Sequence, residues 1–426
     1  MRLCRIITTI LFVATATCAG YAQTDSILVS NKDTIRYKYT PIDIPEEILL
    51  AVSGITTETT KNTQTQTKGA GLRKFIDYVT ASVTDESFEK KIDFSFLISP
   101  YYSNVTSFGL AAVARGWYRL DRHNRALPPS SITISAGGSI RGMYDVRVAN
   151  DNIFKDGKNR LTVNVGFCSM PTRFWGVGYE TAVSNAYVEY VANRQQADVA
   201  YLRRIAKNIY IGMQLDFVYD FCGRDTGVNI IDRLDGERTS YLSTGVSLLA
   251  MYDSRNSSTS PTKGLYISLK GTMRPKPLGN IGTTLWRVTA TADYFQRLWR
   301  GAVLAIDLYG EFNSRNTPWT LCARVGDTHR MRGYYEGRFI DRNLVLAQAE
   351  LRQNLWQRLG IAVWGGAGNV FGSVKDFAWR HTLPTYGVGL RWSIKNGATI
   401  RLDYGFGKRI NGALTNGLIF SINESF

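Results

Sequence analysis

The stretch RMRGYYEGRFID, residues 330–341, decides how the rest of the chain is organised. It carries three positive and two negative charges, which is too many for a strand that spans a membrane. It is also too long and too aromatic for a simple turn, and segments of alternating apolar and polar residues flank it on both sides. We interpret it as a long loop tucked into the polar interior of a β-barrel. The alternative is a solvated surface loop.

The chain begins with a segment typical of a secretory signal peptide. After a basic start come a short apolar run over residues 6–16 and small residues at Gly20 and Ala22, which is the order of regions in such a peptide. We therefore expect residues 1–22 to be removed and the mature chain to begin at Gln23.

The composition of the remaining chain narrows its class. It has no apolar stretch long enough for a transmembrane helix, and aromatic residues are plentiful. An exported chain of this kind is either a soluble all-β protein or an outer-membrane barrel. The formal net charge of +16 suits contact with outer-membrane lipid head groups or lipopolysaccharide. We expect no nucleic-acid partner for an exported chain.

Residues 23–90 differ from the part that follows. Residues 56–71 are rich in Thr, Lys, Gln and Asn and lack periodic apolar residues, which is typical of a flexible linker. We expect residues 23–90 to form a short, weakly ordered periplasmic or linker segment, and residues 91–426 to form one domain.

From about Asp93 onward, apolar and polar residues alternate with the period of two that β-strands require. Clear examples lie at residues 209–217, 286–294, 302–309 and 400–407. One face of each segment is apolar, and the other carries most of the charges and glycines. A soluble sandwich would bury the apolar face, whereas a barrel in lipid would turn it outward. The signal peptide and strand lengths of about nine to twelve residues favour the barrel.

The pattern therefore predicts an all-β fold, a transmembrane antiparallel β-barrel of about 16 strands. The long loop falls between strands 11 and 12. The last strand runs towards Phe426, and an aromatic residue in this place resembles the assembly signal of outer-membrane barrels. The predicted strands begin near Asp93, Thr106, Ser131, Met143, Arg160, Ala186, Ile209, Leu242, Gly264, Thr284, Ala302, Leu344, Gly360, Thr385, Ala398 and Ala413.

At the long loop the chain resembles the BamA/TamA-type superfamily, also called the bacterial surface antigen family. Arg332, Gly333 and Tyr334 match the Arg-Gly-aromatic motif that this family carries between strands 11 and 12. Residues 252–264 and 367–371 also look like family segments, and the resemblance covers about residues 91–426. It implies a location in the outer membrane of a diderm (Gram-negative) bacterium.

The resemblance also implies an ion pair inside the barrel. In the family the loop arginine pairs with acidic residues of the wall, and Glu350 matches the one on strand 12. The position of the second acid is occupied here by Gly366, so we expect Arg332 to depend on Glu350 alone. A planar guanidinium in a partly dry interior is well matched by a carboxylate. The alternative is that Arg332 only anchors the loop and stabilises the barrel.

The sequence contains no motif typical of a catalytic site. The three histidines are scattered, and neither a nucleophile elbow nor a phosphate-binding loop is present. We therefore expect no enzyme, no cofactor and no metal site.

The resemblance points instead to outer-membrane biogenesis, in which a protein or lipid is inserted or translocated. Other outer-membrane or periplasmic proteins would then be partners. The family's insertases and secretion pores usually carry periplasmic POTRA domains, which we do not recognise in residues 23–90. A passive pore or structural barrel remains an alternative, as does an accessory subunit of a larger outer-membrane complex.

Overall fold

The computed structural model describes residues 90–426, apart from residues 104–105, 122–126, 128, 155–156, 185, 224–233, 235–237, 259, 357, 394–398 and 423. The expected signal peptide, residues 1–22, lies outside the described residues. So does the expected linker segment, residues 23–90, except for Lys90. Within the described part of the chain, no helix has the length and apolar character needed to cross a membrane.

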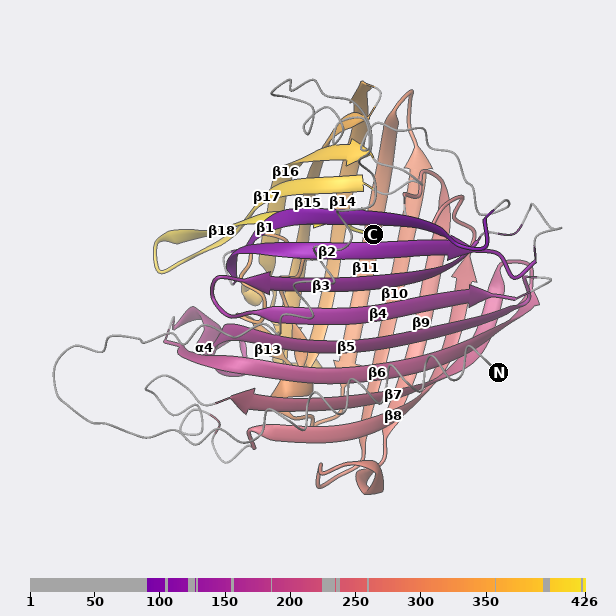
Figure 1. Cartoon of the computed structure of the whole chain (residues 1–426). Coiled ribbons are helices and arrows are strands. Elements are labelled where there is room, and N and C mark those ends of the chain that lie inside the picture. Colours follow the sequence, from indigo (N-terminus) through magenta and orange to yellow (C-terminus); the bar gives the residue numbers. More distant parts are fainter. Residues whose placement is uncertain are drawn as a thin grey trace, which may run out of the picture. The chain divides into compact units, whose positions relative to one another are not determined.

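Sixteen antiparallel strands form one continuous sheet, in which each strand pairs with its neighbour along the chain. This is the predicted all-β barrel, and every strand begins within two residues of its predicted start. The strands are β1 (Asp93–Ser103), β2 (Ser107–Tyr118), β3 (Ser130–Ser139), β4 (Tyr144–Ile153), β5 (Asn159–Phe174), β6 (Val188–Ala206), β7 (Ile209–Gly223), β8 (Ser240–Asp253), β9 (Gly264–Arg274), β10 (Leu285–Arg297), β11 (Ala302–Asn313), β14 (Asn343–Trp356), β15 (Leu359–Phe371), β16 (Leu383–Ser393), β17 (Thr399–Ile410) and β18 (Ala413–Ile422). The first and last strands, β1 and β18, lie next to each other (Figure 1).

Short elements lie in the connections between the strands. They are α4 (Tyr179–Val183), η1 (Lys276–Leu278), η2 (Trp319–Leu321), β12 (Ala323–Arg324), β13 (Ile340–Asp341), η3 (Val374–Asp376) and η4 (Trp379–His381). We call the end of the barrel where β1 begins and β18 ends the terminal end. The opposite end is the loop end, because the long loop, residues 314–342, leaves and rejoins the sheet there.

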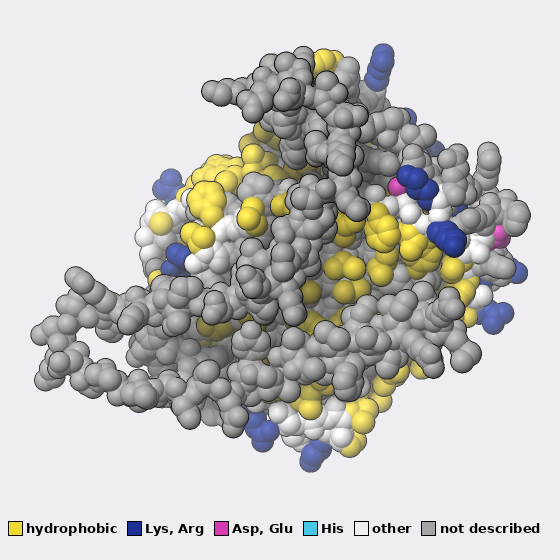
Figure 2. Space-filling view, in the orientation of Figure 1, with side chains coloured by type: hydrophobic (Ala, Val, Ile, Leu, Met, Phe, Trp, Pro, Cys, Tyr) yellow, Lys and Arg dark blue, Asp and Glu magenta, His cyan; other side chains and the backbone are white. Residues whose placement is uncertain are grey.

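The distribution of side chains is that of a barrel surrounded by lipid. In β16, residues with alternating exposure place Tyr386, Val388 and Leu390 outside, each about half exposed, and Thr385 and Arg391 inside. Apolar residues thus face outward and polar residues inward, which is the reverse of a soluble protein. Figure 2 shows hydrophobic side chains gathered over the described outer face, with Lys and Arg side chains at its margins.

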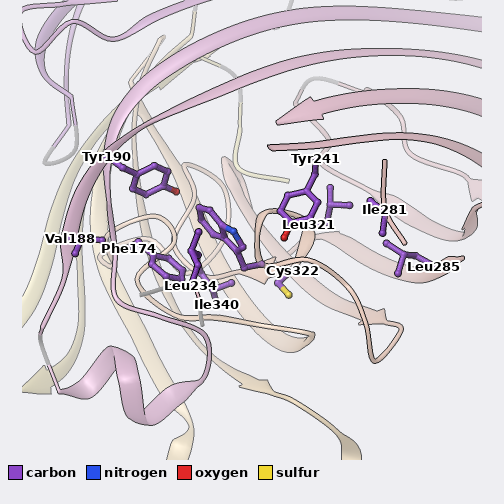
Figure 3. Close-up of a cluster of buried hydrophobic side chains, with 11 residues drawn as sticks. Phe174, Val188, Tyr190, Leu234, Tyr241, Ile281, Leu285, Leu321, Cys322 and Ile340 are labelled. Carbon is purple, nitrogen blue, oxygen red and sulfur yellow. The ribbon is translucent and has the colours of Figure 1, made fainter. Parts of the chain in front are cut away.

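The long loop enters the barrel through an apolar cluster at the loop end. Trp319 and Leu321 of η2 are almost fully buried, and the Trp319 ring packs against Phe174 of β5 and Tyr190 of β6, with centroids 4.6 and 5.6 Å apart. Figure 3 shows Leu321 and Cys322 of the loop among side chains that come from the wall. Burial of these side chains holds the first part of the loop inside the sheet, so the alternative of a solvated surface loop is wrong.

Candidate functional site inside the barrel

The motif residues, Arg332, Gly333 and Tyr334, lie on a hairpin within the long loop. Strands β12 and β13 pair with each other, so the segment between them folds back as a hairpin. Met331 and Phe339 of this hairpin are fully buried and belong to an apolar cluster with Leu344 of β14 and Leu383 of β16. Arg330 and Arg332, on either side of Met331, are thereby held against the inner wall.

Gly333 makes the closest approach between the loop and the wall. Its φ of +105° lies in the left-handed region, which favours glycine. A Cβ added there would lie 2.7 Å from the backbone carbon of Gly405 and 2.7 Å from the nitrogen of Phe406. A Cβ added at Gly405 would in turn lie 2.8 Å from the carbonyl carbon of Arg332. Two glycines, one on the loop and one on β17, therefore let the two backbones touch.

Tyr334 fixes the loop to the neighbouring strands. Its hydroxyl donates a hydrogen bond to the carbonyl oxygen of Pro384 at 2.6 Å and accepts one from the backbone N–H of Lys408 at 2.7 Å. The ring lies over Gly407, where a Cβ would come within 2.5 Å of it. The aromatic residue of the motif thus ties the loop to β16 and β17.

Arg332 is fully buried and bridges two carboxylates of the wall. One terminal nitrogen lies 2.5 Å from Glu350 Oε2 on β14, and the other lies 2.6 Å from Asp403 Oδ2 on β17. The guanidinium also stacks on Trp364 of β15, 3.7 Å from the ring centroid. A planar group with donors on two sides suits this bridge, and a lysine could not make both bonds in the same geometry.

The two carboxylates are shared with three further arginines. Arg352 contacts Glu350 at 2.8 Å, Arg391 contacts Asp403 at 2.5 Å, and Arg401 lies 3.5 Å from Asp403. We define the Arg332 cluster as the seven side chains that these ion pairs join, each less than 10% exposed: Arg332, Arg352, Arg391, Arg401, Glu350, Asp403 and Glu424. Four positive and three negative charges lie together out of water. Loss of any one carboxylate would therefore leave more buried positive charge without a negative partner.

The expectation of a single carboxylate is wrong. Arg332 has a second acidic partner, Asp403, which comes from β17 and not from the position of Gly366 on β15. In the register, Gly366 lies opposite Gln348, while Glu350 lies opposite Trp364. The stacked Trp364 ring takes the place beside Glu350 on β15, and the second acid reaches Arg332 from two strands further along the sheet.

Gly366 has no room for an acid. A Cβ there would lie 2.6 Å from the Cβ of Gln348 and 2.7 Å from the carbonyl oxygen of Ala347. We therefore expect Gly366→Asp to lower the unfolding temperature of the barrel in detergent, and not to restore the stability lost in Glu350→Gln. Thermal unfolding of the two single variants and the double variant checks this, and a double variant more stable than Glu350→Gln would contradict it.

The Omp85 superfamily domain matches residues 128–426, about the sheet from its third strand onward. The chain belongs to the Omp85 superfamily. Similar solved structures include BamA from Haemophilus ducreyi lacking POTRA domains 1–3, with a TM-score of 0.54 and 12% identity over 78% of this chain and 70% of that one. No curated protein matches the chain.

Two CdiB structures have a similar fold. CdiB from Acinetobacter baumannii has a TM-score of 0.52 and 15% identity over 79% of this chain and 60% of that one. For CdiB from Escherichia coli the TM-score is 0.53, the identity 10%, and the shares 79% and 63%. This Omp85 barrel thus spans less than two thirds of either CdiB structure, and at these identities the likeness concerns the fold.

A second arginine of residues 330–341, which was not predicted from the sequence, pairs with the wall of this Omp85 barrel. Arg330 binds Asp307 of β11 through two hydrogen bonds of 2.8 and 2.9 Å and stacks on Tyr309, 4.3 Å from the ring centroid. Gln348 of β14 also donates to Asp307, at 2.9 Å. Arg330 and Arg332 point to different strands, so the hairpin is held from two sides. The alternation of β11 placed Asp307 with the polar residues and was the available signal.

The residues after β18 turn into the Arg332 cluster. Glu424 pairs with Arg391 at 3.1 Å, and the Ser425 hydroxyl donates to Glu350 at 3.0 Å. The carbonyl oxygen of Phe426 accepts a hydrogen bond from Arg352 at 3.1 Å. We call residues 424–426 the terminal segment. The predicted role of Phe426 as an assembly signal stays a prediction.

A cavity of about 670 Å³ lies between the hairpin and the wall. Its lining includes charged side chains of both signs, among them Asp145, Arg147, Arg194, Asp220 and Glu336. Among the described residues, no group of three or more His, Cys, Asp or Glu side chains could hold a metal ion. The charged side chains of the lining can form ion pairs and hydrogen bonds.

Proposed function

We propose that this Omp85 barrel acts in outer-membrane biogenesis, where it helps a protein or lipid to insert into or cross the outer membrane of a diderm (Gram-negative) bacterium. Membership of the superfamily supports this role, as does likeness to BamA and CdiB at the level of fold. The observation that carries the proposal is the Arg332 cluster, because it joins the long loop, the wall and the segment after β18 in one ion-pair network.

The junction of β1 and β18 is the place where the barrel would open. Each of these strands has one ladder, to β2 and to β17, and no ladder between the two occurs among the described residues, although they are in contact. The pairing of β17 with β18 has a register shift after Phe406, and Gly405 lies opposite Gly417. Glycine pairs add no side-chain packing between strands, so β18 is weakly held by β17, the one strand with which it forms a ladder.

The terminal segment offsets this weakness from inside the barrel. Contacts to Arg391, Glu350 and Arg352 hold the end of β18 to the wall and, through Glu350, to the loop. Release of these contacts would free β18 to separate from β1. The two exposed edges would then offer backbone hydrogen bonds to an incoming strand.

Insertion into vesicles tests the proposed function. Vesicles that contain the purified barrel should accelerate the folding of an outer-membrane barrel added from urea, relative to empty vesicles. Equal rates would contradict the proposal. A steady ionic conductance without acceleration would favour a passive pore, for which the charged cavity of about 670 Å³ is the supporting observation. Co-purification of another membrane protein that depends on residues 23–90 would favour an accessory subunit.

The contact between Glu424 and Arg391 gives a direct prediction. Glu424→Gln removes one of three acids from a cluster with four arginines, and a hydrogen bond between charged groups contributes about 1.5–3 kcal/mol. We expect β18 to be cleaved faster by protease in detergent, with a small fall in unfolding temperature. Glu189→Gln is the matched control, because the ion pair of Glu189 with Arg173 at the loop end is exposed and should contribute little. Equal cleavage of both variants would mean that the terminal segment does not hold β18.

A further inference from the structure

Two neighbouring turns at the terminal end carry the same kinds of residue. The turn between β10 and β11 has the sequence Arg-Leu-Trp-Arg at residues 297–300, and the turn between β14 and β15 has Leu-Trp-Gln-Arg at residues 355–358. Because β11 pairs with β14, the two turns lie side by side. We define the Leu-Trp patch as these residues: Leu298, Trp299, Leu355 and Trp356, with Arg297, Arg300 and Arg358.

Hydrogen bonds join the two turns into one surface. The Trp299 indole N–H donates to Gln353 Oε1 at 2.9 Å, and the backbone N–H of Asn354 donates to the carbonyl oxygen of Gly301 at 2.7 Å. The Gln353 amide also donates to the carbonyl oxygen of Arg300 at 3.4 Å. The relative position of the two turns is therefore set by the fold.

The apolar members of the patch are exposed. Leu298, Trp299, Leu355 and Trp356 are 45%, 56%, 56% and 70% exposed. They continue the outward-facing apolar side of the sheet, since Trp356 lies opposite Leu359, and Ile361 and Val363 follow on the outer face of β15. A tryptophan at such a margin has its apolar body in lipid and its N–H at the polar boundary.

The charge of the patch has one sign. Residues 294–301 and 353–360 include no Asp or Glu. Among the described residues, Arg297 contacts Thr262 of the next turn through a weak hydrogen bond of 3.4 Å. Both side chains are exposed. Guanidinium groups in this position bind phosphate through two parallel hydrogen bonds.

We propose that the Leu-Trp patch binds an anionic glycerophospholipid of the membrane leaflet at the terminal end. The arginines contact its phosphate groups, while the leucines and tryptophans contact the glycerol region and the upper acyl chains. A soluble acidic protein fits less well, because the four apolar side chains are continuous with the surface that lipid covers. The proposal rests on the barrel spanning a membrane and is independent of any role in insertion.

Lipid selectivity measured by mass spectrometry tests the proposal. The full-length protein is reconstituted with phosphatidylcholine and phosphatidylglycerol, extracted in mild detergent, and analysed for lipid that remains bound. We expect phosphatidylglycerol to be enriched over phosphatidylcholine, with the enrichment falling by roughly fivefold for each arginine changed to glutamine at residues 297, 300 and 358. A matched control changes Arg141, Lys276 and Lys375, which are exposed at the loop end, and should keep the enrichment.

Several results would overturn the proposal. One is an absence of enrichment in the unchanged protein, and another is equal enrichment in the patch variant. Addition of lipopolysaccharide provides a second arm, in which preferential retention of lipopolysaccharide through the same arginines would show that the phosphate source is not the phospholipid. Loss of a bound protein from native membranes in the patch variant, with unchanged lipid, would show an acidic protein partner instead. Arg300→Gln alone serves as the test if the triple variant does not fold.

Discussion

Arg332→Ala should lower the unfolding temperature of the barrel in detergent and release the long loop to protease. Arg332 is the member of the cluster that the loop contributes, and it bonds to Glu350 and Asp403 with no exposure to solvent. Loss of one partner from a buried ion pair typically costs about 3–5 kcal/mol. The stacking on Trp364 would be lost as well. Arg338→Ala is the control, because that loop arginine binds the carbonyl oxygen of Ala182 outside the cluster.

The two acidic partners predict opposite kinds of coupling. Glu350→Gln and Asp403→Asn each leave Arg332 with one carboxylate. The double variant leaves this buried guanidinium without a carboxylate, so its loss of stability should exceed the sum of the losses in the two single variants. Arg332→Ala combined with Glu350→Gln should lose less stability than the sum of the two single variants. Each single change already removes the contact between Arg332 and Glu350, and the double variant can lose that contact only once. Thermal unfolding of the five variants checks both cycles. If Asp403→Asn had no effect, Arg332 would depend on Glu350 alone.

Most of the fold could be predicted because it depends on a local pattern. Alternation with a period of two fixes which residues share a face of the sheet, and it placed all sixteen strand starts within two residues of the observed ones. The same alternation put Glu350 on the inner face, where it meets Arg332. Each of these conclusions needs only the sequence of one strand and its immediate neighbours.

The rest of the site depends on contacts between strands that are not neighbours in the sheet. Asp403 shares the inner face of β17 with Arg401. However, β14 and β17 are separated by two strands, and their carboxylates converge only because the loop brings Arg332 between them. Trp364 occupies the position beside Glu350 that would otherwise suit an acid on β15. The terminal segment follows the last strand and has no periodic pattern, so its contacts with the cluster had no signal in the sequence.

Gly333→Ala should be as damaging as the loss of Arg332, although it removes no interaction. At a φ of +105° a residue with a Cβ is strained, which costs about 1–3 kcal/mol. The new methyl group would also lie 2.7 Å from the backbone of Gly405 and Phe406. Neither backbone can yield easily, because Gly405 belongs to two ladders of the sheet. The hairpin must therefore move away from β17, and Arg332 moves with it, out of reach of Asp403.

The opposite side of the same contact supplies the check. Gly405→Ala places its methyl group 2.8 Å from the carbonyl group of Arg332, so it should displace the hairpin in the same direction and lower the unfolding temperature by a comparable amount. Once one change has moved the hairpin away from β17, the second methyl group has more room. The unfolding temperature of the double variant should therefore fall by less than the sum of the two single decreases. Gly365→Ala on β15 is the matched control, because a Cβ there meets nothing closer than 4.0 Å. Additive losses at residues 333 and 405 would mean that the two glycines act through separate contacts and that the loop does not rest on β17.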